Sequence, residues 1–151
     1  MGVDDLRRLV SGWRLVALDT MVFSYHLANH PRYAPLTSVV LEAIESGQVA
    51  GVTTTITLAE ILTVPAAAGD QLALQDYELY LTRFTNLTIV PLDVALAREA
   101  ALVRGSARLR TPDAIQVAAA RLASADAIIT HDGRWAGRID RPRVVVLEEY
   151  A

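Results

Sequence analysis

Four carboxylates in this chain occupy positions at which an acidic side chain can do chemistry. Asp19, Glu60, Asp113 and Asp132 each stand where an apolar strand is expected to end or a helix to begin. Two like charges about 4 Å apart repel by roughly 4 kcal/mol at the effective dielectric constant near a protein surface. If the four side chains converge, a divalent metal ion bound between them is the simplest explanation.

Each of these acids also has a purely structural explanation, and the residues alone leave both open. Asp19 is a favoured cap for the helix that follows it. Glu60 stands three residues after Thr57, which fits the S/T-x-x-E pattern of a capping box. Asp113 in a first helical turn favours the helix dipole, and Asp132 precedes a glycine, as in many turns.

The composition excludes several classes of protein. The chain has 151 residues, 52% of them hydrophobic, which predicts one domain over residues 1–151 with a full core. Cysteine is absent, so there is no disulfide, thiolate metal site or cysteine nucleophile, and a reducing cytoplasm fits. Lysine is absent too, which excludes a P-loop and Schiff-base chemistry. No apolar run reaches the length of a membrane span, and no signal peptide is expected.

Arginine supplies all 14 basic residues, and eight of them lie in residues 101–151. Its planar guanidinium suits bidentate contacts with phosphate, so the C-terminal third is predicted to touch a phosphate backbone; a GC-rich genome would explain the bias equally well. Near the acids, the arginines indicate either ion pairs or phosphate held beside a metal. These arginines are Arg104, Arg108, Arg110, Arg134 and Arg138.

The expected elements alternate between strands and helices. The apolar runs predict strands at 13–18, 49–54, 87–92, 127–130 and 143–147. Helices are expected at 20–28, 36–46, from 57 to about Pro65, 70–84, 93–104 and 111–124, with Gly105–Arg110 as a loop and Thr111 and Pro112 as cap and first residue of the last helix. This order predicts a three-layer α/β/α fold with a mainly parallel, roughly five-stranded sheet. All four acids can then reach the carboxyl edge of the sheet, where such folds bind ligands.

Four segments of the chain resemble the motifs of the PIN-domain family, and within it the VapC-type toxins of bacterial toxin–antitoxin pairs. They are Leu18-Asp19-Thr20, the segment from Thr57 to Leu62 around Glu60, the segment from Thr111 to Ala120 around Asp113, and Ile129-Thr130-His131-Asp132. The four acids are separated by 41, 53 and 19 residues, which suits the family. The resemblance covers roughly residues 14–148.

The resemblance implies a metal-dependent endoribonuclease. Asp19, Glu60, Asp113 and Asp132 would hold one or two Mg²⁺ or Mn²⁺ ions, with Asp19 and Asp113 central, and Thr130 would support the site through its hydroxyl. Arginines of the C-terminal third would hold the RNA substrate. The family also implies a cytoplasmic toxin with a VapB-type antitoxin partner and a homodimer.

Other interpretations stay open. The chain could be a catalytically silent PIN-like module that binds RNA or a protein, although intact acids in all four motifs speak against it. A phosphotransfer enzyme of the haloacid-dehalogenase type is disfavoured, because the chain has no lysine and no second acid two residues after Asp19. His131 stands where many relatives carry asparagine and is expected to be a turn residue without chemistry. The segment 1–12 is an N-terminal extension, either a helix or an artefact of the assigned start. One apolar face of the helix expected at 70–84 is a weak candidate for a dimer interface, although such a stripe is more typical of a core. Its residues are Tyr77, Tyr80, Leu81 and Phe84.

Overall fold

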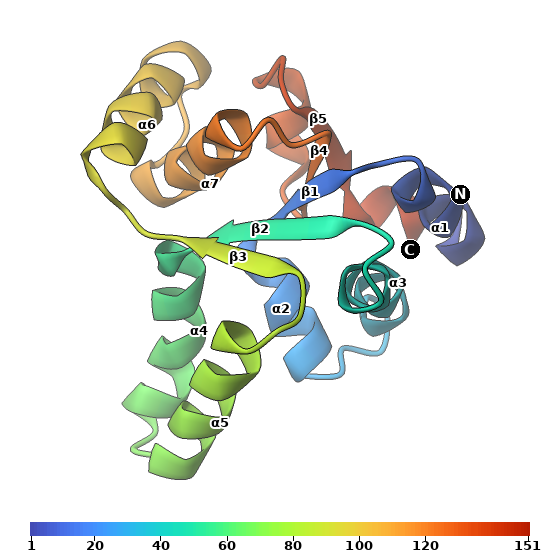
Figure 1. Ribbon diagram of the computed structural model, residues 1–151, viewed down its shortest axis with the longest axis vertical. Helices are drawn as coiled ribbons and strands as arrows, with labels where there is room; N and C mark the ends of the chain where they lie inside the picture. The colour runs from blue at the N-terminus through green and yellow to red at the C-terminus, as the bar shows by residue number, and fades with distance from the viewer.

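Five parallel strands form the sheet in the computed structural model, which describes all 151 residues (Figure 1). The strands are β1 (Leu15–Leu18), β2 (Ala50–Thr54), β3 (Leu87–Val90), β4 (Ala127–Thr130) and β5 (Arg143–Val146). They lie in the order β3-β2-β1-β4-β5. From β1 the chain extends the sheet to one side through β2 and β3, and then returns to add β4 on the other side. The direction therefore switches between β1 and β4, which is where open α/β sheets bind ligands.

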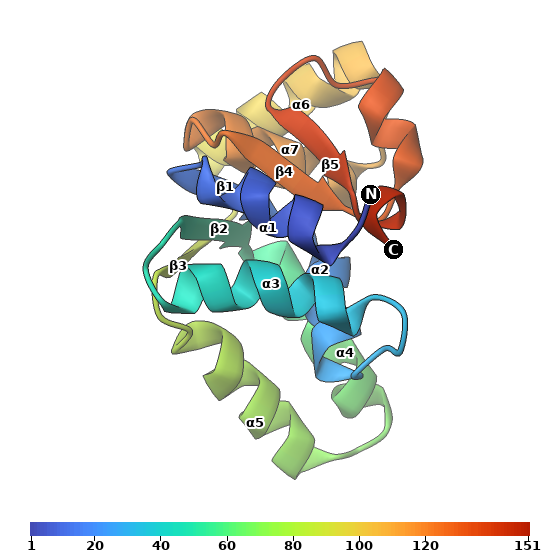
Figure 2. The same cartoon turned by 90° about the vertical axis from the view of Figure 1, so that its right-hand side faces the viewer.

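Helices cover both faces of this sheet (Figures 1 and 2). The helices are α1 (Val3–Ser11), α2 (Thr20–Leu27), α3 (Ala34–Glu45), α4 (Thr55–Ala67), α5 (Gln71–Thr82), α6 (Val94–Ala107) and α7 (Thr111–Leu122). Two short 3-10 helices follow the last strands, η1 (Gly133–Gly137) and η2 (Leu147–Tyr150). One buried core joins the sheet to α1–α5, and a second joins it to α6, α7 and η1. The predicted three-layer α/β/α fold is thereby confirmed.

The pleat of the strands explains the two cores. In β1, Val16 and Leu18 are buried in the core with α1–α5, whereas Ala17 is buried in the core with α6 and α7. In β4, Ile128 and Ile129 divide between the faces in the same way. Central strands covered on both faces carry apolar residues at every position. This burial holds the carboxyl ends of β1 and β4 firmly in place.

Several boundaries differ from those predicted. Helix α6 runs on to Ala107, because Val103 and Ala107 are both buried and Arg108 closes the helix in a left-handed conformation (φ 56°). Thr111 is the first residue of α7 rather than its cap, a position taken by Arg110. Pro65 does not end α4, which continues past it to Ala67.

The N-terminal extension is a helix, as one of the two interpretations held. Leu6 and Val10 of α1 are fully buried, and α1 packs alongside α3 (Figure 2). The aromatic face of α5 is also part of the core: Leu81 is buried, and its aromatic neighbours pack against the same core. Packing in the core therefore accounts for this face, although its aromatic residues stay partly exposed. No helix of the chain has the length and apolar character needed to cross a membrane.

Candidate active site

Asp19 is the most deeply buried of the four acids, with 9% of the residue exposed. It follows β1 and caps α2, so its structural explanation holds as well: Oδ1 accepts from the N–H of Thr20 (2.8 Å). Oδ2 accepts from the hydroxyl of Thr130 (2.9 Å). Burial raises the pKa of Asp19 to about 6 against these two hydrogen bonds, and the charges of Asp113 and Glu60 raise it further. A negative charge at this position therefore lacks a counterion.

Thr130 couples two of the acids through one hydroxyl group. It ends β4 and is fully buried. Its hydroxyl donates to Asp19 and accepts from the backbone N–H of Asp132 (3.1 Å). The strand end thus fixes the distance between the two acidic segments.

Asp132 forms a salt bridge with Arg134. Its Oδ1 accepts from the backbone N–H (3.0 Å) and from Nε (2.9 Å) of Arg134, and its Oδ2 accepts from Nη2 (2.6 Å). These hydrogen bonds lower the pKa of Asp132 to about 2. The Arg134 side chain is 68% exposed, so the pair is open to water and to exchange of partners.

Asp113 lies in the first turn of α7 and faces the pocket between the acids. Its Oδ2 is 3.6 Å from Nε of Arg110, which forms the only ion pair with it. Burial raises the pKa of Asp113, with a smaller contribution from the charge of Asp132, while Arg110 opposes the change. Asp113 resembles Asp19 in this respect: both are acids whose charged form is poorly compensated.

Glu60 is exposed in the second turn of α4, and its Oε1 accepts from the hydroxyl of Thr20 (2.8 Å). The capping-box interpretation is wrong. Helix α4 begins at Thr55, because the hydroxyl of Thr54 accepts a backbone N–H of the first turn (3.2 Å). Thr57 therefore lies inside the helix, and no cap needs Glu60.

All four acids line one pocket of about 170 Å³ at the carboxyl edge of the sheet. Its other lining residues are Thr20, Met21, Arg110, His131 and Trp135. No three histidine, aspartate or glutamate side chains converge closely enough to hold an ion. We attribute this spread to Arg134, which engages both oxygens of Asp132. Thr20 engages only Oε1 of Glu60.

The donor set nevertheless fits a divalent cation. Carboxylate oxygens are the ligands that Mg²⁺ and Mn²⁺ prefer. Asp19 and Asp113 have raised pKa values because their charges are buried near other carboxylates, and a cation between them would remove that cost. Asp132 would have to release the guanidinium of Arg134 to join them, whereas Glu60 can join through Oε2 while Oε1 keeps the hydrogen bond from Thr20.

The predicted phosphate-binding arginines divide into two groups. Arg104 donates to the carbonyl of Leu109 (3.1 Å) and the hydroxyl of Thr111 (2.9 Å), so it braces the loop between α6 and α7. A small pocket beside the acids, shared with Asp113 and Asp132, is lined by the other four arginines. These are Arg108, Arg110, Arg134 and Arg138.

A buried polar network beneath the pocket was missed by the sequence analysis. Its centre is Gln116 of α7, which is 3% exposed and hydrogen-bonded to the hydroxyls of Thr20, Thr54 and Thr57. The signal available in the sequence was one amide in an otherwise apolar run, three residues after Asp113. An amide buried among alanines needs hydrogen-bond partners, but the sequence does not name them.

His131 is a partly exposed residue at the bend after β4, as predicted, and it also lines the pocket. Its ring packs edge-to-face against Tyr25 (centroids 5.4 Å apart) and Tyr33 (5.3 Å). Tyr25 lies in α2 and Tyr33 directly precedes α3, so these contacts hold the ring against the segment that follows β1.

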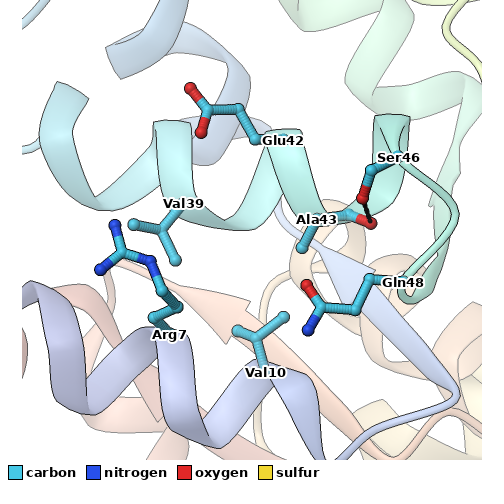
Figure 3. A pocket seen from close by; sticks show the side chains of 7 residues that line it. All are labelled: Arg7, Val10, Val39, Glu42, Ala43, Ser46 and Gln48. Atoms are coloured by element: carbon cyan, nitrogen blue, oxygen red, sulfur yellow. Dashed lines mark hydrogen bonds between the residues drawn. The ribbon is translucent and has the colours of Figure 1, made fainter.

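A second pocket lies between α1 and α3, away from the four acids (Figure 3). It is lined by Arg7 and Val10 of α1 and by residues of α3 and its C-terminal end, among them Glu42 and Gln48. Glu42 is its only acid. This pocket therefore lacks the donor set that a metal needs.

Comparisons with known proteins agree with the predicted family. The sequence matches the model of the PIN domain over residues 16–141. No curated protein sequence matches the chain. Solved structures do share its fold. A chain of a toxin–antitoxin complex from Klebsiella pneumoniae is 19% identical with a TM-score of 0.63, over 87% of this chain and 97% of that one.

Two further structures are similar to the same extent. VapBC2 from Rickettsia felis, bound to a DNA fragment from its promoter, is 16% identical with a TM-score of 0.68, over 87% of this chain and 98% of that one. FitAcB from Neisseria gonorrhoeae is 23% identical with a TM-score of 0.62, over 88% and 98%. At these identities the likeness is one of fold.

Proposed function

Because the chain belongs to the PIN domain family, we propose that it is a Mg²⁺- or Mn²⁺-dependent endoribonuclease and the toxin of a toxin–antitoxin pair. One observation carries the catalytic part of the proposal. Four acids from four distant segments of the chain line a single pocket at the switch point of the sheet. Helix caps and turns explain some of these acids one by one, but they do not explain why all four share one pocket.

Asp19 and Asp113 are the proposed central ligands, with Glu60 and Asp132 binding directly or through water. A divalent ion in this pocket would supply an acidified water as the nucleophile and a positive charge for the leaving oxygen. Thr130 keeps Asp19 oriented by donating to Oδ2. Its acceptor contact with the N–H of Asp132 keeps that segment close.

RNA is the proposed substrate, and the arginine pocket is its proposed backbone contact. Arg108, Arg110, Arg134 and Arg138 lie beside Asp113 and Asp132, so a phosphate held there would place the next phosphodiester near the acids. Guanidinium groups bind phosphate oxygens bidentately. Arg104, predicted with them, is proposed to act by holding the loop that carries Arg108 and Arg110.

The remaining parts of the proposal follow from the relatives. Several similar structures are VapBC or FitAB complexes, so a VapB-type antitoxin is the proposed partner. A homodimer and a cytoplasmic location are proposed on the same ground. The antitoxin would have to keep RNA from the pocket of the four acids.

A silent RNA- or protein-binding module is the second candidate, and one observation favours it. The guanidinium of Arg134 donates to both oxygens of Asp132 and so supplies the counterion that a non-catalytic site would need. A nuclease must release this pair when an ion binds, whereas a silent module would keep it.

Cleavage of RNA with Mg²⁺, Mn²⁺ or EDTA separates the two candidates. The parent should cut single-stranded RNA with either ion and not with EDTA, while Asp19→Asn and Asp113→Asn should lose activity by several orders of magnitude. Asp93→Asn is the matched control, because Asp93 caps α6 in the same way but lies outside the pocket. Activity that survives EDTA and both pocket substitutions would refute the metal mechanism. RNA bound but never cut would favour the silent module.

A further inference from the structure

We propose that Gln116 is a positioning residue, which fixes the carboxylate of Glu60 through the hydroxyl of Thr20; the inference rests on the proposed function. Glu60 is exposed on α4, and a glutamate side chain left free there would sample many rotamers. Its hydrogen-bond partner in the site is the hydroxyl of Thr20, which lies 2.8 Å from Oε1 of Glu60. What directs the Thr20 hydroxyl therefore decides where Glu60 stays.

The orientation of the Gln116 amide follows from Thr54. The Thr54 hydroxyl accepts the N–H of Ile56 as the cap of α4 (3.2 Å), and its own hydrogen donates to Oε1 of Gln116 (2.9 Å). A carbonyl oxygen is the amide atom that can accept this hydrogen. The NH₂ group of Gln116 must then point the other way, toward Thr57 (2.6 Å) and Thr20 (3.3 Å).

The direction of the next hydrogen bonds follows from that of the amide. The Thr20 oxygen receives an N–H from Gln116 and lies 3.1 Å from the Thr57 oxygen. An ionised carboxylate only accepts, so the single hydrogen of Thr20 is the one that donates to Glu60. An N–H of Gln116 is thereby directed at Thr20, and the hydrogen of Thr20 is directed at the carboxylate of Glu60.

Helix α7 thus serves the site twice. Asp113 and Gln116 are three residues apart and share one face of the helix. Asp113 enters the pocket, and Gln116 supports Glu60 of α4 through Thr20, the residue next to Asp19. Groups that orient a metal ligand in this way typically change metal affinity 10- to 100-fold when removed.

Mn²⁺ binding measured by isothermal titration calorimetry tests the inference without any turnover. Gln116→Met keeps the length of the side chain and removes its donors, and Mn²⁺ should bind to it about 10- to 100-fold more weakly than to the parent. Gln116→Met also leaves buried hydroxyls unpaired and lowers stability. Val103→Ala, a buried substitution in the same core but outside the pocket, is therefore the control for stability and should bind Mn²⁺ as the parent does.

A double-mutant cycle decides whether Gln116 acts through Thr20. Thr20→Val removes the hydroxyl that contacts Glu60, and adding Gln116→Met to it should weaken Mn²⁺ binding no further. Equal affinity in the parent and Gln116→Met, equal losses in Gln116→Met and Val103→Ala, or additive losses in the cycle would each overturn the inference. If the parent itself binds no Mn²⁺, the proposed function fails instead.

Discussion

Replacing Asp19 by asparagine is expected to stabilise the metal-free protein at neutral pH. Asp19 has a pKa of about 6 in the folded protein against an ordinary value of 3.8. Each pKa unit is worth about 1.4 kcal/mol, so ionising Asp19 costs the folded state about 3 kcal/mol at pH 7. Asparagine carries no charge and avoids this cost.

The sign and the pH range follow from linkage. Below pH 3.8 Asp19 is protonated in the folded and unfolded states alike, and its charge costs nothing. As the pH rises from about 4 to about 6, the unfolded chain loses the proton first, and the parent loses stability relative to the variant. The stability difference between Asp19→Asn and the parent should therefore grow by about 2–3 kcal/mol between pH 4 and pH 7.5, and stay constant above that.

Urea unfolding in EDTA at a series of pH values measures this difference. The stability gained by Asp19→Asn is reduced by about 1 kcal/mol, because asparagine offers one acceptor oxygen and cannot accept from both Thr20 and Thr130. This reduction does not depend on pH, so the change of the stability difference with pH is unaffected. Asp93→Asn at pH 7.5 is the control for replacing a capping aspartate, since asparagine caps a helix as well as aspartate does, and it should not stabilise the protein. A stability difference between Asp19→Asn and the parent that does not change with pH would refute the reasoning, because Asp19 would then bear its charge without cost.

Three more substitutions test other contacts of the site. Arg134→Gln removes the guanidinium from both oxygens of Asp132 and leaves only the backbone N–H on Oδ1. Mn²⁺ should then bind several-fold more tightly in calorimetry; weaker binding would mean that Arg134 does not compete with the ion. Thr130→Val removes the buried hydroxyl that contacts Asp19 and Asp132. Urea unfolding at pH 7.5 should show that the free energy of unfolding falls by about 1–3 kcal/mol; an unchanged urea midpoint would contradict this. Arg138→Gln should raise the KM for RNA and lower its dependence on salt by about one ion; an unchanged salt slope would exclude Arg138 from phosphate contact.

The fold and the meeting of the four acids were predictable from the sequence for one physical reason. Parallel strands with an unbroken apolar run, such as Ala127–Ile129, must be central and covered on both faces. Their carboxyl ends then share one edge, so the acids that follow or face those ends share it too. Asp19 and Asp132 reach the same pocket because Leu18 pairs with Ile129.

The hydrogen bonds that hold the acids were not predictable in the same way. Gln116 and Thr57 lie 59 residues apart, and no periodicity links an amide on one helix to a hydroxyl on another. The capping-box interpretation of Glu60 failed for a related reason. Thr54 and Thr57 are both capable caps, and tertiary contacts decide between them, because Thr57 is needed in the buried network.

Pairing of β1 with β4 also governs when the site can exist during synthesis. The partners Asp19 and Thr130 are 111 residues apart in the chain, and β1 emerges from the ribosome long before β4. Until Asp113 is added, a growing chain carries only two of the four acids, and Asp19 has no strand beside it to supply the Thr130 hydroxyl. On the proposed function, a growing chain that has not yet reached Thr130 and Asp132 therefore lacks the site that would cut the messenger RNA encoding it.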